Sequence, residues 1–368
     1  MNILATSCRV FGVTSPHRSL DLYAAEDVEL QPELSILLPI YNAAPFLGQC
    51  LDSLGRQTFA DYEVVAVDDG STDESAAILE QRSHTEERLR IVHRGHHGLV
   101  ETLNAGLEEC RGRFLARMDA DDIAHPRRLE HQIAALEAVD GPDVISSLVA
   151  HFPRQALGEG FRIYERWLNS LVSHEDIFRE RFIESPLPHP SVMLRRQDLI
   201  DIGGYHDEGW PEDYDLWLRL AAAGKHFGKV PRVLYLWRHH ESRLTRTDPR
   251  YSVERFLTCK AQHLAQGPLD GISQVILWGA GQTGRRLSKH LMRRHVHLAA
   301  FIDIDSRTIG RTLRGLPIHP PNQLPEILAA ADDTVVLAAV SSRGARALIR
   351  QQLTNFGLSE GDQFWCVA

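Results

Sequence analysis

The stretch EVVAVDDG at residues 63–70 places an apolar strand directly before two aspartates. Similar apolar runs occur at 35–42 (SILLPIYN) and 114–122 (FLARMDADD), and residues 89–92 are a further candidate strand. Leucines at helical spacing lie between these runs, and the segment 71–74 (STDE) matches a capping box at a helix start. Strands that alternate with helices predict an α/β fold, in which a mostly parallel sheet has helices on both faces.

The carboxyl ends of these strands carry polar side chains. The first strand ends near Tyr41 and Asn42, the second at Asp68 and Asp69, and the fourth at residues 119–122. In open parallel sheets, ligands bind outside the carboxyl ends of the strands. We therefore expect these three clusters, which are distant in sequence, to meet at one edge of the sheet and form a site.

Composition and charge limit the classes of function. The chain has 368 residues and a formal net charge of −9, which argues against a general nucleic-acid binder. Its five cysteines are scattered without a CxxC pair, so we expect reduced thiols in a cytoplasmic protein. No apolar run approaches the ~18 residues of a membrane span, and peripheral contact with a membrane stays open. Residues 1–33 form an N-terminal extension without an assigned function, and no pattern indicates the oligomeric state.

Asp119, Asp121 and Asp122 place three carboxylates at the end of a predicted strand. Carboxylates this close repel one another unless a cation or protons neutralise them. Magnesium and manganese take oxygen ligands and often bridge a carboxylate to substrate phosphates. The alternative is a solvated turn, in which aspartate is common. The position at a strand end favours a metal site.

A second acidic motif, PEDYDLW at residues 211–217, opens a predicted helix. Glu212 and Asp213 lie in its first turn, where the helix dipole favours anions. That preference alone would explain both residues. The alternative is a general base that takes a proton from an acceptor.

Six ordered motifs resemble those of the family 2 glycosyltransferases, and the resemblance covers roughly residues 34–250. The motifs are 35–42 (SILLPIYN), 67–73 (VDDGSTD), 116–122 (ARMDADD), 189–193 (HPSVM), 203–205 (GGY) and 211–217 (PEDYDLW). The resemblance implies an A-type nucleotide-diphospho-sugar transferase fold with a mixed, mostly parallel sheet. It also implies inverting transfer to an acceptor hydroxyl and a divalent cation, Mn²⁺ or Mg²⁺. One departure is TLN at 102–104, where many relatives carry an arginine before the asparagine.

The resemblance also implies a role for each matching residue. The catalytic residues would be Asp213, as the base, and its neighbour Glu212. Residues that bind the donor nucleotide, expected to be a uridine diphosphate, would be Pro39, Tyr41, Asn42, Asp69 and Asp119. Residues on the acceptor side would be His189, Tyr205 and Trp210. The partners would be a nucleotide-sugar donor and a glycan or lipid-linked acceptor.

The metal ligands implied by the resemblance are Asp121, its neighbour Asp122, and His240. The segment 237–245 (WRHHESRLT) is similar to a family segment with a histidine near the diphosphate. Imidazole is a suitable additional ligand. The alternative is a surface histidine, in a chain that has 19 of them.

A second α/β unit is predicted at 272–368, after a linker at 251–271. Gly279, Gly281 and Gly284 follow a strand and open a helix, and Asp303 ends the next strand, as in a dinucleotide-binding motif. Residues 301–305 (FIDID), with Gly310 and 315–318 (GLPI) after them, also resemble the amino-terminal, nucleotide-sugar-binding half of sugar acyltransferases. The third alternative is a Rossmann-like domain with an empty pocket that serves packing or assembly.

The leading hypothesis is therefore a glycosyltransferase. A second hypothesis is a nucleotide-binding regulatory or scaffold protein whose transferase half is inactive. A third and weaker one is an oxidoreductase centred on the C-terminal unit, and the sequence lacks the Tyr-x-x-x-Lys pair that would support it.

Overall fold

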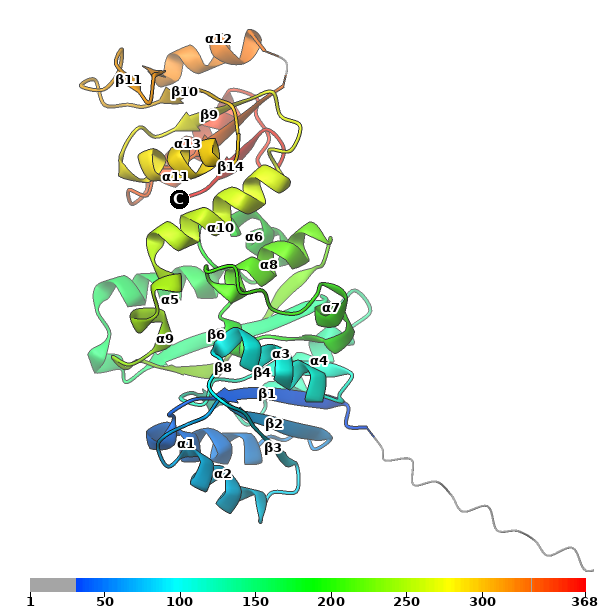
Figure 1. The fold of residues 1–368 in the computed structure, drawn as a ribbon. Coiled ribbons are helices and arrows are strands. Elements are labelled where there is room, and N and C mark those ends of the chain that lie inside the picture. The colour runs from blue at the N-terminus through cyan, green and yellow to red at the C-terminus, as the bar shows by residue number, and fades with distance from the viewer. Residues whose placement is uncertain (1–30, 332) are drawn as a thin grey trace, which may run out of the picture. The chain divides into compact units, whose positions relative to one another are not determined.

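The described part of the chain comprises residues 31–331 and 333–368, seen in a computed structural model (Figure 1). Residues 1–30 of the predicted N-terminal extension lie outside it, together with Cys8. The remaining cysteines, Cys50, Cys110, Cys259 and Cys366, are buried and unpaired. Within the described ranges, no helix combines the length and the apolar character that crossing a bilayer requires.

Four parallel strands form where the sequence has its first four apolar runs. The strands are β1 (Leu34–Ile40), β2 (Tyr62–Asp68), β3 (Leu89–His93) and β4 (Phe114–Arg117). The helices that follow them are α1 (Ala44–Gly55), α2 (Ser75–Ser83), α3 (Leu99–Glu109) and α4 (Arg128–Leu136). β1 and β2 are buried at every position, because α1 packs on one face of the sheet and α3 on the other.

The sheet continues in the order β3-β2-β1-β4-β7-β6-β8-β5. The added strands are β5 (Ile123–Ala124), β6 (Val144–Phe152), β7 (Met193–Arg195) and β8 (Phe227–Arg238). β7 runs antiparallel to both of its neighbours, whereas β6 and β8 are parallel to each other. The helices near them are α5 (Glu159–Ser170), α6 (His174–Glu180), α7 (Arg196–Asp201) and α8 (Glu212–Ala222). This mixed, mostly parallel sheet confirms the predicted fold class.

The capping-box prediction at 71–74 was wrong in its details. Helix α2 begins at Ser75, and its N-cap residue is Glu74 rather than Ser71. The side chain of that N-cap residue accepts no capping hydrogen bond from the first turn of the helix. Instead, the carboxylate of Asp73 accepts hydrogen bonds from the amide of Ser75 at 2.9 Å and from the amide of Ala44 at 3.0 Å. Asp73 therefore joins the starts of α1 and α2, a tertiary contact that a local sequence motif does not contain.

A smaller sheet follows, in the order β11-β12-β10-β9-β13-β14. Its strands are β9 (Gln274–Trp278), β10 (Leu298–Ile302), β11 (Thr312–Leu313), β12 (Leu316–His319), β13 (Thr334–Ala338) and β14 (Phe364–Cys366). Its helices are α11 (Gln282–Arg293), α12 (Leu324–Ala329) and α13 (Ala345–Asn355). All pairs are parallel except β11 with β12, and β9 lies at the centre, as in a Rossmann-like unit.

Helix α10 (Val253–Gln266) occupies most of the predicted linker. It packs against both α8 and α11, and its apolar side chains belong to one core cluster with Tyr214 and Leu287. Its buried Lys260 donates hydrogen bonds to the carbonyl of Ile183 at 3.0 Å and to that of Val367 at 2.7 Å. Residues 251–271 thus join the two sheets through a helix, and the domain boundaries stay predictions.

Candidate active site

A cavity of about 900 Å³ opens at the carboxyl ends of β1 and β4. The predicted site residues on its wall are Pro39, Tyr41, Asn42, Asp69, Asp119, Asp121, His189, Glu212, Asp213 and His240. Asp122, Tyr205 and Trp210 do not belong to its wall. The fold therefore brings residues of the first, second, third, fourth and sixth sequence motifs together in one cleft.

At one end of the cavity, the ring of Tyr41 stacks on that of His96, with centroids 4.0 Å apart. The carboxylate of Asp69 accepts hydrogen bonds from the amides of His97 and Gly98, both at 2.9 Å. Gly98 precedes α3, so Asp69 fixes the loop that carries the stacked ring of His96. Direct contact of Asp69 with a nucleobase stays a prediction.

Asn42 has a local structural role that the sequence did not indicate. Its φ of 51° lies in the left-handed region, which asparagine tolerates. The side-chain oxygen of Asn42 accepts a hydrogen bond from the backbone amide of Thr72 at 2.8 Å. The backbone amide of Asn42 donates to the hydroxyl of Ser71 at 3.0 Å. These bonds connect the loops after β1 and β2.

The three aspartates of the DADD segment come together as predicted. Oxygen atoms of Asp119, Asp121 and Asp122 lie within 4.8 Å of one another. Nε2 of His240 lies 2.7 Å from a carboxylate oxygen of Asp121, and that contact joins the loop after β8 to the loop after β4. Carboxylate oxygens and an imidazole at this spacing fit a divalent cation.

Arg243, which the sequence did not single out, neutralises this cluster. Its guanidinium lies 3.2 Å from Asp119, 3.2 Å from Asp122 and 3.9 Å from Asp121. Arg117 adds a second cation 2.5 Å from Asp119. A sequence signal for Arg117 existed, because an arginine inside an apolar strand requires a buried anionic partner.

The electrostatics separate Asp121 from Asp122. Burial raises the pKa of Asp121, but the hydrogen bond with His240 and the charge of Arg243 outweigh burial and lower it overall. Burial raises the pKa of Asp122 well above its usual range, and Arg243 opposes this only in part. Asp122 is fully buried and accepts hydrogen bonds from the hydroxyl of Tyr235 at 2.9 Å and from the amide of Arg238 at 2.6 Å. Asp121 thus suits a metal better than Asp122 does.

We expect Arg243→Met to destabilise the protein by roughly 3–5 kcal/mol, because it leaves buried carboxylates without their counter-charge. Urea unfolding at pH 7 measures this loss, and added Mn²⁺ should restore part of it. Arg246→Met, on the exposed side of α9 (Leu244–Thr247), is the matched control. Equal unfolding midpoints for the two variants would contradict the proposed counter-charge role.

At the far side of the cavity, Glu212 and Asp213 start α8, but their surroundings differ. The side chain of Glu212 is buried, and the hydroxyl of Tyr251 donates to both of its oxygens at 2.9 Å. Arg250 lies 4.0 Å from the same carboxylate. The carboxylate of Asp213 is on the cavity wall and accepts a hydrogen bond from the amide of Tyr214 at 2.7 Å. Asp213 is therefore better placed to meet a ligand.

Burial, followed by the charge of Glu212, raises the pKa of Asp213 to about 8. Burial also raises the pKa of Glu212, and the hydrogen bond from Tyr251 opposes that rise. A carboxylate with a raised pKa is a stronger base than an ordinary aspartate. These surroundings suit Asp213 to take a proton from an alcohol.

The three predicted acceptor-side residues occupy different places. His189 lies on the cavity wall, and its Nε2 is 3.0 Å from the hydroxyl of Tyr205. Burial and then the charge of Arg117 lower the pKa of His189 well below its usual value, so the ring is neutral. Tyr205 is buried behind His189. Its backbone amide donates to the side-chain oxygen of Asn104, and its backbone carbonyl accepts a hydrogen bond from the side-chain nitrogen of Asn104. Tyr205 therefore supports the wall rather than forming it.

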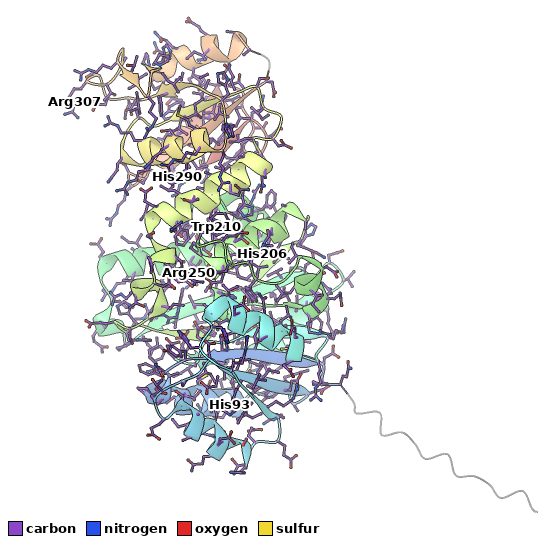
Figure 2. All side chains as sticks on the ribbon, viewed as in Figure 1. His93, His206, Trp210, Arg250, His290 and Arg307 are labelled. Atoms are coloured by element: carbon purple, nitrogen blue, oxygen red, sulfur yellow. The ribbon has the colours of Figure 1, made fainter. Side chains whose placement is uncertain are left out.

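The acceptor-side position predicted for Trp210 was wrong. Its indole is buried in the core cluster between α8 and α10, and its Nε1 donates to Asp215 at 3.2 Å (Figure 2). A large side chain just before an amphipathic helix gains more by burial in that core than by exposure in a polar cleft.

The glycine-rich loop after β9 has the backbone of a dinucleotide-binding turn. A side chain at Gly284 would place its Cβ 1.8 Å from the carbonyl oxygen of Gly279, so α11 packs against the loop through glycine. The carboxylate of Asp303 accepts a hydrogen bond from the amide of Ala280 at 2.7 Å. Asp303 therefore fixes the loop, and a nucleotide at Gly279, Gly281, Gly284 and Asp303 stays a prediction.

Comparisons with known proteins agree with this geometry. The family model described as "Glycosyl transferase family 2" matches residues 35–203. The amylovoran biosynthesis glycosyltransferase AmsE of Erwinia amylovora is 36% identical over 203 residues, which are 54% of this chain and 74% of that protein. An Escherichia coli UDP-Gal:alpha-D-GlcNAc-diphosphoundecaprenol beta-1,3-galactosyltransferase is 28% identical over 55% of this chain and 73% of its own length.

Solved structures share the fold. The crystal structure of S. aureus TarS 1–349 in complex with UDP superposes with a TM-score of 0.51 and 18% identity. The superposition covers 82% of this chain and 79% of that one. At this identity, the likeness supports the arrangement of the sheet and not the choice of substrate.

Proposed function

This chain belongs to glycosyl transferase family 2, and from that premise we propose that it transfers a sugar from a nucleotide-diphosphate donor to an acceptor hydroxyl, with inversion and with a divalent cation. The observation that carries the proposal is the shared cavity. Asp121 and His240 meet on one part of its wall, and Asp213 lies on another. A transferase of this kind needs those two features.

The donor would lie at the end of the cavity formed by Tyr41, Asp119 and Asp121. Asp121 and His240, together with Asp119, would hold the cation, which when bound neutralises charge on the diphosphate leaving group. The positive charge of Arg243, which lies beside these carboxylates, offsets their mutual repulsion. The protein groups thus prepare a place for negative charge.

Asp213 would act as the general base. It takes the proton of the acceptor hydroxyl while the acceptor oxygen bonds to the anomeric carbon. The bond between that carbon and the diphosphate oxygen breaks, and its electron pair leaves with the nucleotide diphosphate. Because attack and departure occur on opposite faces, the anomeric configuration inverts.

We further propose a uridine-diphosphate sugar as the donor and a growing polysaccharide or lipid-linked glycan as the acceptor. The name of the Escherichia coli relative, which contains both UDP-Gal and a diphosphoundecaprenol, supports both choices. The test is a screen of UDP- and GDP-sugars with Mn²⁺, scored by release of nucleotide diphosphate. Turnover of a nucleotide-sugar supports the proposal, whereas nucleotide binding without any turnover supports an inactive, regulatory protein.

The pH dependence follows from the raised pKa of Asp213. Because only the deprotonated carboxylate is a base, we expect kcat/KM to rise with pH, to reach half of its maximum near pH 8 and to level off above about pH 9. Glu212→Gln should move this rise to lower pH, since it removes the neighbouring charge that helps to raise the pKa. A kcat/KM value that stays constant from pH 6 to pH 9 would argue against Asp213 as the base.

A further inference from the structure

Beyond the donor site, the cavity wall near Asp213 carries polar groups that the proposed reaction does not use. Tyr164 comes from α5, Glu184 from the loop after α6, and Arg250 from the segment before α10 (Figure 2 labels Arg250). We propose that Tyr164 and Glu184 form, beside Asp213, the subsite that binds the acceptor sugar, and that this sugar is uncharged. The proposal rests on the transferase function proposed above and deepens it.

These groups offer hydrogen bonds that the protein does not itself satisfy. One oxygen of Glu184 accepts a hydrogen bond from the amide of Ser185 at 3.1 Å, and no described residue donates to its other oxygen. The hydroxyl of Tyr164 has no hydrogen-bond partner among the described residues. Nη1 of Arg250 is buried and has no hydrogen-bond partner in the described part of the chain, although carboxylate oxygens of Asp207 and Glu212 lie 4.0 Å from it. A sugar ring, with several hydroxyls that both donate and accept, matches such a set of donors and acceptors.

The phenol and the carboxylate have defined roles. Burial, with the nearby charges of Glu184 and Asp213, raises the pKa of Tyr164 well above its usual value, so the phenol stays protonated and donates. Glu184 therefore accepts from one sugar hydroxyl while Tyr164 donates to another. Phe256, on the wall of the same cavity, supplies an apolar surface for the ring of the sugar.

Charge selects for an uncharged acceptor. The carboxyl groups of Glu184, Glu212 and Asp213 lie on this part of the wall, and burial raises the pKa of all three, so the site already disfavours negative charge. The cations near them are already paired, Arg250 with Asp248 at 2.9 Å and Arg117 with Asp119 at 2.5 Å. Lys260, which lies behind Glu184, donates to backbone carbonyls. An acidic sugar such as a uronic acid would bring a fourth carboxylate into a poorly solvated site, which costs affinity.

The test measures transfer to glycosides of glucose, galactose, mannose, N-acetylglucosamine and glucuronic acid, each with a methyl or an octyl aglycone. Preference for the octyl series indicates a lipid-linked acceptor, and equal use of both series indicates a free glycan. The variants are Glu184→Gln and Tyr164→Phe. Glu175→Gln, on the exposed first turn of α6, is the matched control. Hydrolysis of the donor without acceptor is measured for every variant.

We expect a neutral glycoside to be the best acceptor, and both variants to raise its KM about 10-fold or more. Both variants should lower transfer to the acceptor more than they lower hydrolysis of the donor, and Glu175→Gln should match the wild type throughout. In addition, Glu184→Gln should reduce the difference in KM between the neutral and the acidic acceptors. An unchanged acceptor KM in both variants, or glucuronide as the best acceptor, would overturn the subsite. Wild-type protein that turns over no donor would instead refute the proposed function.

Discussion

Asp213→Asn is expected to lower kcat about 10²- to 10⁴-fold, the contribution that a general base typically makes. The side chain keeps its size and its hydrogen bond from the amide of Tyr214, so the loss reports the missing base. Steady-state release of nucleotide diphosphate in the presence of acceptor measures it. Asp201→Asn, at the exposed end of α7, is the matched control and should keep full activity.

The stability of the same variant shows whether its activity falls because the base is missing or because the protein no longer folds. The pKa of Asp213 is raised in the native protein from 3.8 to about 8, so the native state holds a proton that the unfolded chain releases. Stability therefore falls as pH rises through this window, and the asparagine variant escapes that loss. We expect Asp213→Asn to be at least as stable as the wild type at pH 8. Thermal unfolding at pH 5 and pH 8 tests this, and an inactive variant that is also destabilised at pH 8 would not identify the base.

Asp121→Asn should lower kcat/KM about 100-fold or more, because several kcal/mol of charge stabilisation depend on the cation. The hydrogen-bonding shape is kept, but one anionic ligand is lost, so higher concentrations of Mn²⁺ should recover part of the activity. His240→Ala should show the same recovery with a smaller loss. Chelation of divalent cations should abolish the activity of the wild type in the same assay.

The control for Asp121→Asn is Asp52→Asn, whose exposed carboxylate pairs with Arg82 at 2.6 Å. It should leave both activity and metal dependence unchanged. The cation would have no part in the mechanism if the wild type stayed fully active in the presence of a chelator and Asp121→Asn had the same kcat/KM as the wild type.

Prediction of the fold from sequence worked where one element carries its own signal. The apolar runs of β1 and β2 indicate buried strands because their own residues fill the core on both faces. The start of α2 was misplaced because Asp73 bonds to Ala44, a residue from another helix. Helix α10 was missed because its apolar side chains pack on α8 and α11, which lie far away in sequence.

The sequence predicted that side chains at the strand ends would share one cavity, but it did not predict the side chains that support them. The topology of a parallel sheet brings Asp69 and Asp121 to one cavity without knowledge of any contact. Arg243 and Tyr251 come from loops whose paths depend on the whole fold, so no local pattern indicated that they would contact Asp122 and Glu212. Trp210 was misplaced for a related reason, since its burial depends on α10.

The most direct test is a crystal structure of the protein grown with MnCl₂ and UDP, with diffraction data collected at the manganese absorption edge. We expect an anomalous peak bonded to Asp121 and His240, with the diphosphate of UDP on the same ion and the uracil near Tyr41. Manganese at another place, or UDP bound at the glycine-rich loop of Gly279 while the cavity stays empty, would contradict the proposed donor site.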